Sequence, residues 1–220
     1  TVVGTIRAGG LLRASRPFRD GAAARVVVGH LGPGMVRGDA FAIDGRVARG
    51  AHLIVAGQMA TRVLSGPDAV TNASNWIVER DALLELIAEP TLVAAGAAYD
   101  ARLTIALEPG ARAVVVELLR REPGAAMRVS TGVRRGTRDA LIDVLRFDTD
   151  DDEYAAIGTL AVFGAVDIDA LDRAADRRAN VRIGIGALRD GDALARVMGP
   201  SIWAVREALG TLHRAAAAAL

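Results

Sequence analysis

A short phrase recurs along the chain at intervals of about thirty residues. A turn residue, glycine or aspartate, is followed by alanine and then by an apolar run of the kind that forms β-strands. The turn residues are Gly21, Gly50, Asp81, Gly110 and Asp139. A repeat of this length is typical of a unit that cannot bury its apolar face alone and stacks on its neighbours. The repeat therefore predicts a layered, β-helix-like or solenoid scaffold, a class that more often binds than catalyses.

Within each repeat the apolar residues alternate with more variable ones. Counted from the turn residue, the third position holds Ala24, Leu53, Leu84, Ala113 and Ile142, and the fifth holds Val26, Val55, Leu86, Val115 and Val144. Alternation with a period of two predicts that these positions lie on one buried strand face. Further strands are expected at 40–48, 75–79, 99–107 and 127–133. The pair Asp44-Gly45 is also a signal for a hairpin turn.

The repeat pattern ends near residue 148. The acidic run Asp148 to Glu153 indicates a solvated loop, because it lacks the alternating ligands and the glycine of a calcium loop. Beyond it we expect a strand at 158–165, a helix capped by Asp167 or Asp169, a hairpin of 181–188 with 193–198, and a final helix at 201–219. The chain is thus predicted to be mainly β with a few helices. A β-rich repeat body at 1–150 and a small β-α-β-β-α closing unit at 151–220 would form one integrated domain.

The composition argues against some classes of partner and indicates the cellular compartment. All 27 basic residues are arginine, but the formal net charge is only +1 and no basic stripe with interleaved aromatics is present, which argues against a nucleic-acid surface. No apolar run approaches the roughly 20 residues of a membrane span. Residues 1–10 show no signal-peptide pattern, and the chain has no cysteine. These features predict a protein of the reducing cytoplasm, without membrane attachment.

No motif for bond chemistry stands out. The serines Ser65, Ser74, Ser130 and Ser201 have no nucleophile-elbow setting. Gly184-Ile185-Gly186 lies in an alternating stretch and is interpreted as a strand, not a phosphate loop. We therefore predict no catalytic residues and no enzyme. A β-solenoid enzyme acting on carbohydrate and a purely structural binding scaffold are the alternatives, and the scarcity of aromatic residues disfavours the first.

Metal ligands are sparse in the sequence. His30, His52 and His213 are far apart and none has a second histidine or a carboxylate at ligand spacing, so a tightly bound metal is not predicted. A route that metal ions pass through transiently, lined by oxygen ligands, is compatible with the sequence. The acids beside apolar strand runs are its candidates, namely Asp39, Glu85, Glu89 and Glu117. The alternative, favoured for any one of them, is an ordinary solvated carboxylate at a strand end.

Three phrases of the repeat region lie at residues 34–66, 83–97 and 103–119, and the first two contain four short motifs in succession. These motifs are Gly38-Asp39, Gly50-Ala51-His52-Leu53, Ala60-Thr61-Arg62 and Glu89-Pro90-Thr91. In their order and spacing, over roughly residues 30 to 150, they resemble the UreD family of urease accessory proteins, called UreH in some organisms.

The resemblance implies a β-helix-like fold of many short strands with two helices, in agreement with the repeat. It also implies a non-catalytic urease maturation factor that joins the F-type accessory protein and the G-type GTPase, docks on apo-urease and helps to pass nickel into its active site. Nickel would then bind transiently and would not be a tightly bound cofactor. Candidates for the nickel path or for partner contacts are Asp39, Thr61, Arg62, Glu85, Glu89 and Glu117.

Overall fold

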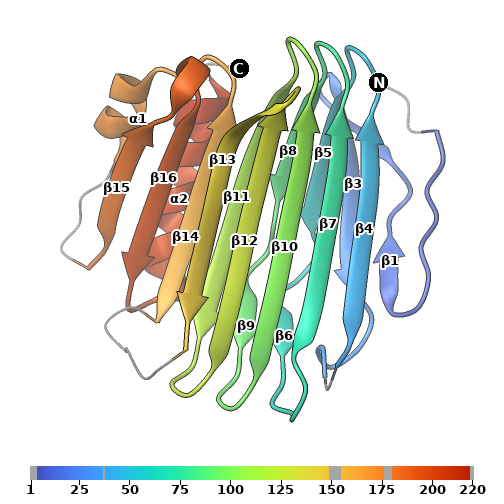
Figure 1. Cartoon of the computed structure of the whole chain (residues 1–220), viewed down its shortest axis with the longest axis vertical. Coiled ribbons are helices and arrows are strands. Elements are labelled where there is room, and N and C mark those ends of the chain that lie inside the picture. Colours follow the sequence, from blue (N-terminus) through green and yellow to red (C-terminus); the bar gives the residue numbers. More distant parts are fainter. Residues whose placement is uncertain (1–3, 37, 149–154, 176–179, 219–220) are drawn as a thin grey trace.

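The computed structural model describes residues 4–36, 38–148, 155–175 and 180–218, which form two facing β-sheets and two helices (Figure 1). An 11-stranded sheet, called the long sheet, contains β1 (Leu12–Ala14), β2 (Phe18–Asp20), β3 (Ala23–His30), β5 (His52–Gly57), β6 (Thr61–Val63), β8 (Leu83–Ile87), β9 (Thr91–Val93), β11 (Arg112–Arg121), β14 (Ala156–Phe163), β15 (Arg182–Ala187) and β16 (Ala193–Gly199). A 5-stranded sheet, called the short sheet, contains β4 (Ala40–Val47), β7 (Val70–Val78), β10 (Ala98–Leu107), β12 (Ala126–Arg135) and β13 (Arg138–Phe147).

The chain passes back and forth between the two sheets as a solenoid of about four turns. In the long sheet β3, β5, β8 and β11 are parallel neighbours, and in the short sheet β4, β7, β10 and β12 are. The predicted turn residues Gly21, Gly50, Asp81 and Gly110 each precede a long-sheet strand and adopt φ angles of 60°, 65°, 58° and 73°. This left-handed backbone is the conformation that glycine, and among other residues aspartate, adopts most readily. The predicted mainly-β, solenoid-like fold is confirmed.

The fifth repeat does not continue the solenoid, and its predicted burial is wrong. After β12 the chain turns back at Gly136, so β13 pairs antiparallel with β12 and stays in the short sheet. The register shifts between Val133 and Arg134. As a result Ile142 and Val144, predicted to be buried, are 72% and 51% exposed.

The predicted hairpin at Asp44-Gly45 is also wrong, because β4 runs through both residues without a turn. Gly45 lies opposite Trp76 in the pairing of β4 with β7. A Cβ atom at Gly45 would collide with the indole ring of Trp76, which is buried and whose Nε1 donates to Ser74 Oγ at 2.7 Å. The glycine therefore makes room for a buried aromatic side chain and does not form a turn.

Substituting Gly45 by alanine is expected to lower the free energy of unfolding by about 1–3 kcal/mol, because overpacking forces the Trp76 ring to move. Urea unfolding followed by tryptophan fluorescence measures this difference. Gly132→Ala is the matched control: Gly132 lies in β12 of the same sheet and a Cβ atom there would meet nothing within 4 Å. Equal unfolding midpoints for the two variants would contradict the packing role of Gly45.

The C-terminal segment adopts the predicted β-α-β-β-α order and extends the long sheet. β14 pairs antiparallel with β11, β16 with β14 and β15 with β16, and a 3₁₀ turn at Arg189–Gly191 joins β15 to β16. Asp167 caps α1 (Ile168–Ala174), and Ser201 caps α2 (Ile202–Ala217). Most of the acidic run lies outside the described residues, as do residues 176–179, to which the sequence predicts that the first helix extends. Neither α1 nor α2 is long and apolar enough to cross a membrane.

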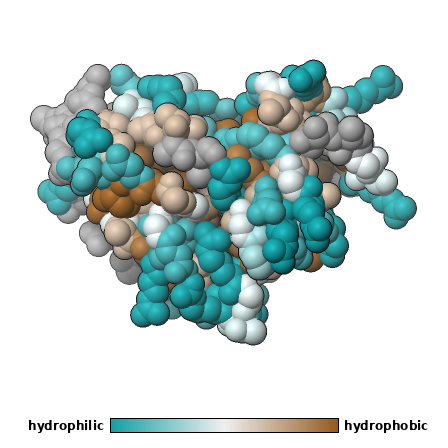
Figure 2. Space-filling view, turned by 90° about the horizontal axis from the view of Figure 1, so that it is seen from above, coloured by the Kyte–Doolittle hydropathy of each residue, from teal (hydrophilic) through white to brown (hydrophobic). Residues whose placement is uncertain are grey.

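Helix α2 packs on the face of the long sheet that points away from the short sheet (Figure 1). Its buried residues, Val205, Ala208, Leu209, Leu212 and Ala216, form one cluster with side chains from β11, β14 and β16. Seen along the strands, the molecule carries mostly hydrophilic atoms on its outside and hydrophobic atoms between its layers (Figure 2). The body is thus a three-layer arrangement of short sheet, long sheet and helix.

Candidate functional site

The space between the two sheets is not uniformly filled. One apolar cluster, which includes Trp76, Leu84 and Phe163, fills one end, and a second, which includes Met35, Tyr99 and Met127, fills the other. Between them lies a cavity of about 230 Å³. Its polar lining includes His30, Thr61, Asn72, Ser74, Glu89, Thr91, Tyr99 and Glu117. A mainly apolar space with a few convergent polar groups is the usual form of a ligand site.

The short sheet contributes hydrogen-bonded polar side chains to the wall of the cavity. Asn72 on β7 donates through Nδ2 to the hydroxyl of Tyr99 on β10 at 3.2 Å. Burial is the main reason why the pKa of Tyr99 is raised to about 12, so the phenol is neutral at physiological pH. These two side chains present an amide and a neutral hydroxyl to the cavity.

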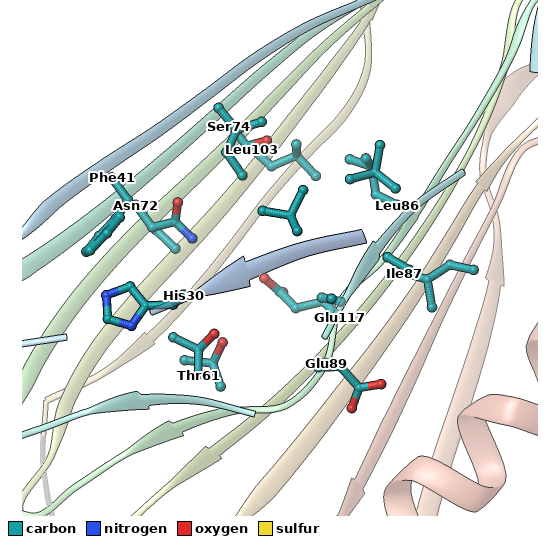
Figure 3. Close-up of a pocket in the computed structure, with 18 of the residues that line it drawn as sticks. His30, Phe41, Thr61, Asn72, Ser74, Leu86, Ile87, Glu89, Leu103 and Glu117 are labelled. Atoms are coloured by element: carbon teal, nitrogen blue, oxygen red, sulfur yellow. The ribbon is translucent and has the colours of Figure 1, made fainter. Parts of the chain in front are cut away.

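The long sheet contributes a carboxylate. Glu117 on β11 points into the cavity (Figure 3). Burial raises its pKa to about 7, with the nearby positive charge of Arg196 opposing the shift and the negative charge of Asp143 adding to it. Glu117 is therefore poised between its neutral and charged forms at physiological pH.

A polar row leads from Glu117 across the long sheet to the short one. Glu117 lies opposite Thr159 of β14, and Thr159 lies opposite Arg196 of β16. Arg196 donates through Nη1 to Thr159 Oγ1 at 2.9 Å and through Nη2 to Asp143 Oδ2 on β13 at 2.6 Å. Because Asp143 engages Arg196 directly, the guanidinium compensates the charge of Glu117 only from a distance.

The cavity reaches the surface where the strands of the long sheet are interrupted. β5 ends at Gly57 and β6 begins at Thr61, while β8 ends at Ile87 and β9 begins at Thr91. Because β5 pairs with β8 and β6 with β9, the two interruptions lie side by side. Met59, in the first interruption, lines the cavity and is 71% exposed. We call this opening the mouth of the cavity.

Glu89 forms part of the mouth, in the second interruption. Gly57 permits this, because a Cβ atom at Gly57 would lie 2.8 Å from the backbone nitrogen of Glu89. The carboxylate points away from Glu117 and toward the outside (Figure 3). There Arg206 of α2 donates through Nη2 to both of its oxygens, each at 2.9 Å.

His30 and Thr61 lie on another part of the wall. His30 packs edge-on against Phe41, with ring centroids 5.0 Å apart. Its Nε2 atom is buried and has no hydrogen-bond partner within the described part of the chain. Both His30 and Thr61 also line a neighbouring surface pocket, which contains Arg62. Thr61 thus lines the cavity, whereas Arg62 lies beside it, in the neighbouring pocket.

Glu85 lies away from the cavity, on the face of the long sheet that carries α2. One carboxylate oxygen contacts His52 Nε2 of β5 at 2.6 Å, and the other lies 3.5 Å from His213 Nε2 of α2. The contacts with His213 and then with His52 lower the pKa of Glu85, against the opposing effect of burial. Each imidazole faces its own oxygen of Glu85, and the His213 contact connects α2 to the long sheet.

The structure therefore separates the six candidates into different settings. Thr61, Glu89 and Glu117 share the cavity, whereas Arg62 lies beside it and Glu85 lies under α2. Asp39 accepts a hydrogen bond from the backbone nitrogen of Val36 at 2.8 Å, which fixes the turn before β4. Over the described ranges, no group of three or more His, Cys, Asp or Glu side chains is arranged to hold a metal ion.

Sequence spacing alone missed the contact between His52 and Glu85. The repeat carried the signal, because His52 is two residues after Gly50 and Glu85 four residues after Asp81. Even positions of adjacent coils share one sheet face, so these side chains are diagonal neighbours on parallel strands. The contacts of α2 with Glu85 and Glu89 have no such signal, since the helix lies outside the repeat.

The sequence of the chain is similar to those of known urease accessory proteins. The family described as UreD urease accessory protein matches residues 1–220. A urease accessory protein UreD of Sorangium cellulosum (strain So ce56) is 30% identical over 212 residues, covering 87% of this chain and 68% of that protein. A UreD of Actinomyces naeslundii is 29% identical, covering 91% and 79%, and one of Bacillus sp. (strain TB-90) is 25% identical, covering 97% and 87%. The chain therefore belongs to the UreD family of urease accessory proteins.

Proposed function

We propose that the chain is a urease maturation factor that holds its partners together and offers nickel a path toward apo-urease. The observation that supports this role is the cavity between the sheets, with Glu117 inside it and Glu89 at its mouth. A solvent-connected cavity with carboxylates at two depths can attract a divalent cation and pass it inward. The path would run through the mouth, past Glu89, to Glu117.

The chemistry of the lining suits passage more than storage. Its polar side chains offer mainly carboxylate, hydroxyl and amide oxygens, with one imidazole from His30, and the lining also includes Arg102. Nickel binds best to imidazole and other nitrogen ligands, and less strongly to single oxygens. A cation that meets a few oxygens at each step is held weakly and can move on. This lining supports the proposal that nickel passes transiently and is not tightly bound.

We further propose that the chain works in the cytoplasm in a complex with the F-type accessory protein, the G-type GTPase and apo-urease. The names of the relatives support a urease accessory role, and the solenoid supplies broad sheet faces for protein contacts. A GTPase partner would supply the nucleotide chemistry. The chain itself would break and form no covalent bonds.

Restoring the chain to cells that lack its gene tests the role and the path together. Without the gene, urease is expected to accumulate inactive and nickel-poor, and the wild-type chain restores both activity and nickel content. With Glu117→Gln, the nickel per urease measured early after induction is expected to fall about tenfold, the effect of losing a charged ligand worth about 1.4 kcal/mol. Glu108→Gln is the matched control, since Glu108 is an exposed carboxylate in a solenoid turn.

Two results would count against the proposal in different ways. Fully metallated urease in cells without the gene overturns the maturation role. A requirement for the gene combined with normal nickel loading by Glu117→Gln overturns the cavity path and leaves a scaffold that acts only by holding partners.

A further inference from the structure

We propose that Arg206 of α2 is a gate on the cavity, because its guanidinium occupies the carboxylate of Glu89 that an incoming divalent cation would meet first. This inference rests on the proposed nickel path and names a regulator of it. In the docked position of α2 the mouth is neutralised. A cation enters when it displaces Arg206 or when a partner shifts this part of the helix.

The geometry of the pair leaves no oxygen of Glu89 uncommitted. Arg206 contacts both Oε1 and Oε2 at 2.9 Å. Because Nη2 contacts both oxygens, it blocks coordination of a metal ion through the two oxygens together, and its positive charge opposes coordination through the remaining lone pairs. The side chains of Arg206 and Glu89 are 47% and 27% exposed, so the pair lies within reach of an arriving ion or protein.

The pair is a weak anchor for the helix. Leu209 and Leu212 on the buried face of α2 are 2% and 0% exposed, and Leu209 packs so tightly on β14 that a Cβ atom at Gly158 would collide with it. Burying one leucine side chain contributes about 1.5–3 kcal/mol, whereas an exposed ion pair contributes about 1 kcal/mol or less. The apolar face therefore holds α2 in place, and Arg206 can release Glu89 at little cost to the fold.

Nickel binding to the full chain tests the gate directly. The probe is Ni²⁺ alone, titrated by equilibrium dialysis in metal-free buffer. Arg206→Gln frees Glu89 and is expected to tighten Ni²⁺ binding about fivefold, the equivalent of about 1 kcal/mol. Arg206→Lys keeps the positive charge but replaces the planar guanidinium, and its Ni²⁺ affinity is expected to lie between those of the wild type and Arg206→Gln. Arg214→Gln is the matched control, because it removes the same charge two turns along α2, where Arg214 bonds to Thr211.

A second background shows whether the gate acts through Glu89. In a Glu89→Gln chain, Arg206→Gln is expected to leave Ni²⁺ affinity unchanged. Tightening by Arg206→Gln that equals that of Arg214→Gln, or that persists without Glu89, overturns the gate. So does weaker binding by both Arg206 variants when thermal unfolding shows them folded, since that is the result of a purely structural contact.

Different results would overturn the proposed gate and the proposed nickel path. If Glu117→Gln weakens Ni²⁺ binding but Arg206→Gln does not tighten it, the path stands and the gate is wrong. If Glu117→Gln and Glu89→Gln both bind Ni²⁺ as the wild type does, the cavity is not the route, and the gate falls with the path on which it rests.

Discussion

Asparagine in place of Asp192 is expected to lower the free energy of unfolding by about 3–5 kcal/mol, the usual cost of breaking a buried ion pair by removing one charge. Asp192 is 1% exposed, and its Oδ1 accepts from Arg135 Nη2 at 2.8 Å and from the backbone nitrogen of Gly164 at 2.9 Å. Arg135 also donates to the carbonyl oxygen of Ala111 at 3.0 Å. One carboxylate thus joins the end of β12 in the short sheet to the β14 and β16 ends of the long sheet.

Urea unfolding monitored by circular dichroism measures this loss. The matched control is Asp190→Asn, which neutralises a neighbouring ion pair with Arg138 whose side chains are 49% and 40% exposed. Asparagine tolerates the positive φ of Asp190, and exposed pairs contribute about 1 kcal/mol or less. Losses of similar, small size in both variants would show that the buried pair does not hold the sheets together.

The repeat predicts most of the solenoid because each coil obeys the same local rule. A residue with positive φ precedes each of β3, β5, β8 and β11, and alternation then sets the buried face, as the burial of Leu84 and Val115 shows. The rule fails at Asp139 because alternation is identical in a parallel coil and in an antiparallel hairpin. The tight turn around Gly136 decides between them, and it shifts the register so that Ile142 faces outward.

The same rule places part of the site. Glu117 is seven residues after Gly110, an odd position, and therefore belongs to the inward face where the cavity lies. Glu85 is four residues after Asp81, an even position, and therefore belongs to the outward face. The contact of Glu89 with Arg206 depends on where α2 docks, which no local pattern specifies.

Glu117→Gln is expected to stabilise the chain by about 3 kcal/mol at pH 8 and to have little effect near pH 4. The ordinary pKa of a glutamate, 4.5, applies to the unfolded chain, and burial raises that of Glu117 to about 7 in the folded chain. Between these values the folded chain keeps a proton that the unfolded chain has lost. Stability that is fully present below pH 4.5 is therefore lost as the pH rises through 7. Glutamine mimics the protonated side chain and removes this slope.

Urea unfolding of the wild type and of Glu117→Gln at a series of pH values from 4 to 8 gives the two stability curves. Parallel curves would show that Glu117 titrates normally in the folded chain. Converging curves at low pH and separate curves at high pH mean that the charged form of Glu117 destabilises the fold. A charged side chain that lowers the stability of the fold, where glutamine would raise it, is expected at a functional site, because such sites keep residues that function needs at a cost in stability.

The proton on Glu117 competes with a cation for the carboxylate, so Ni²⁺ binding by the wild-type chain should strengthen as the pH rises through 7.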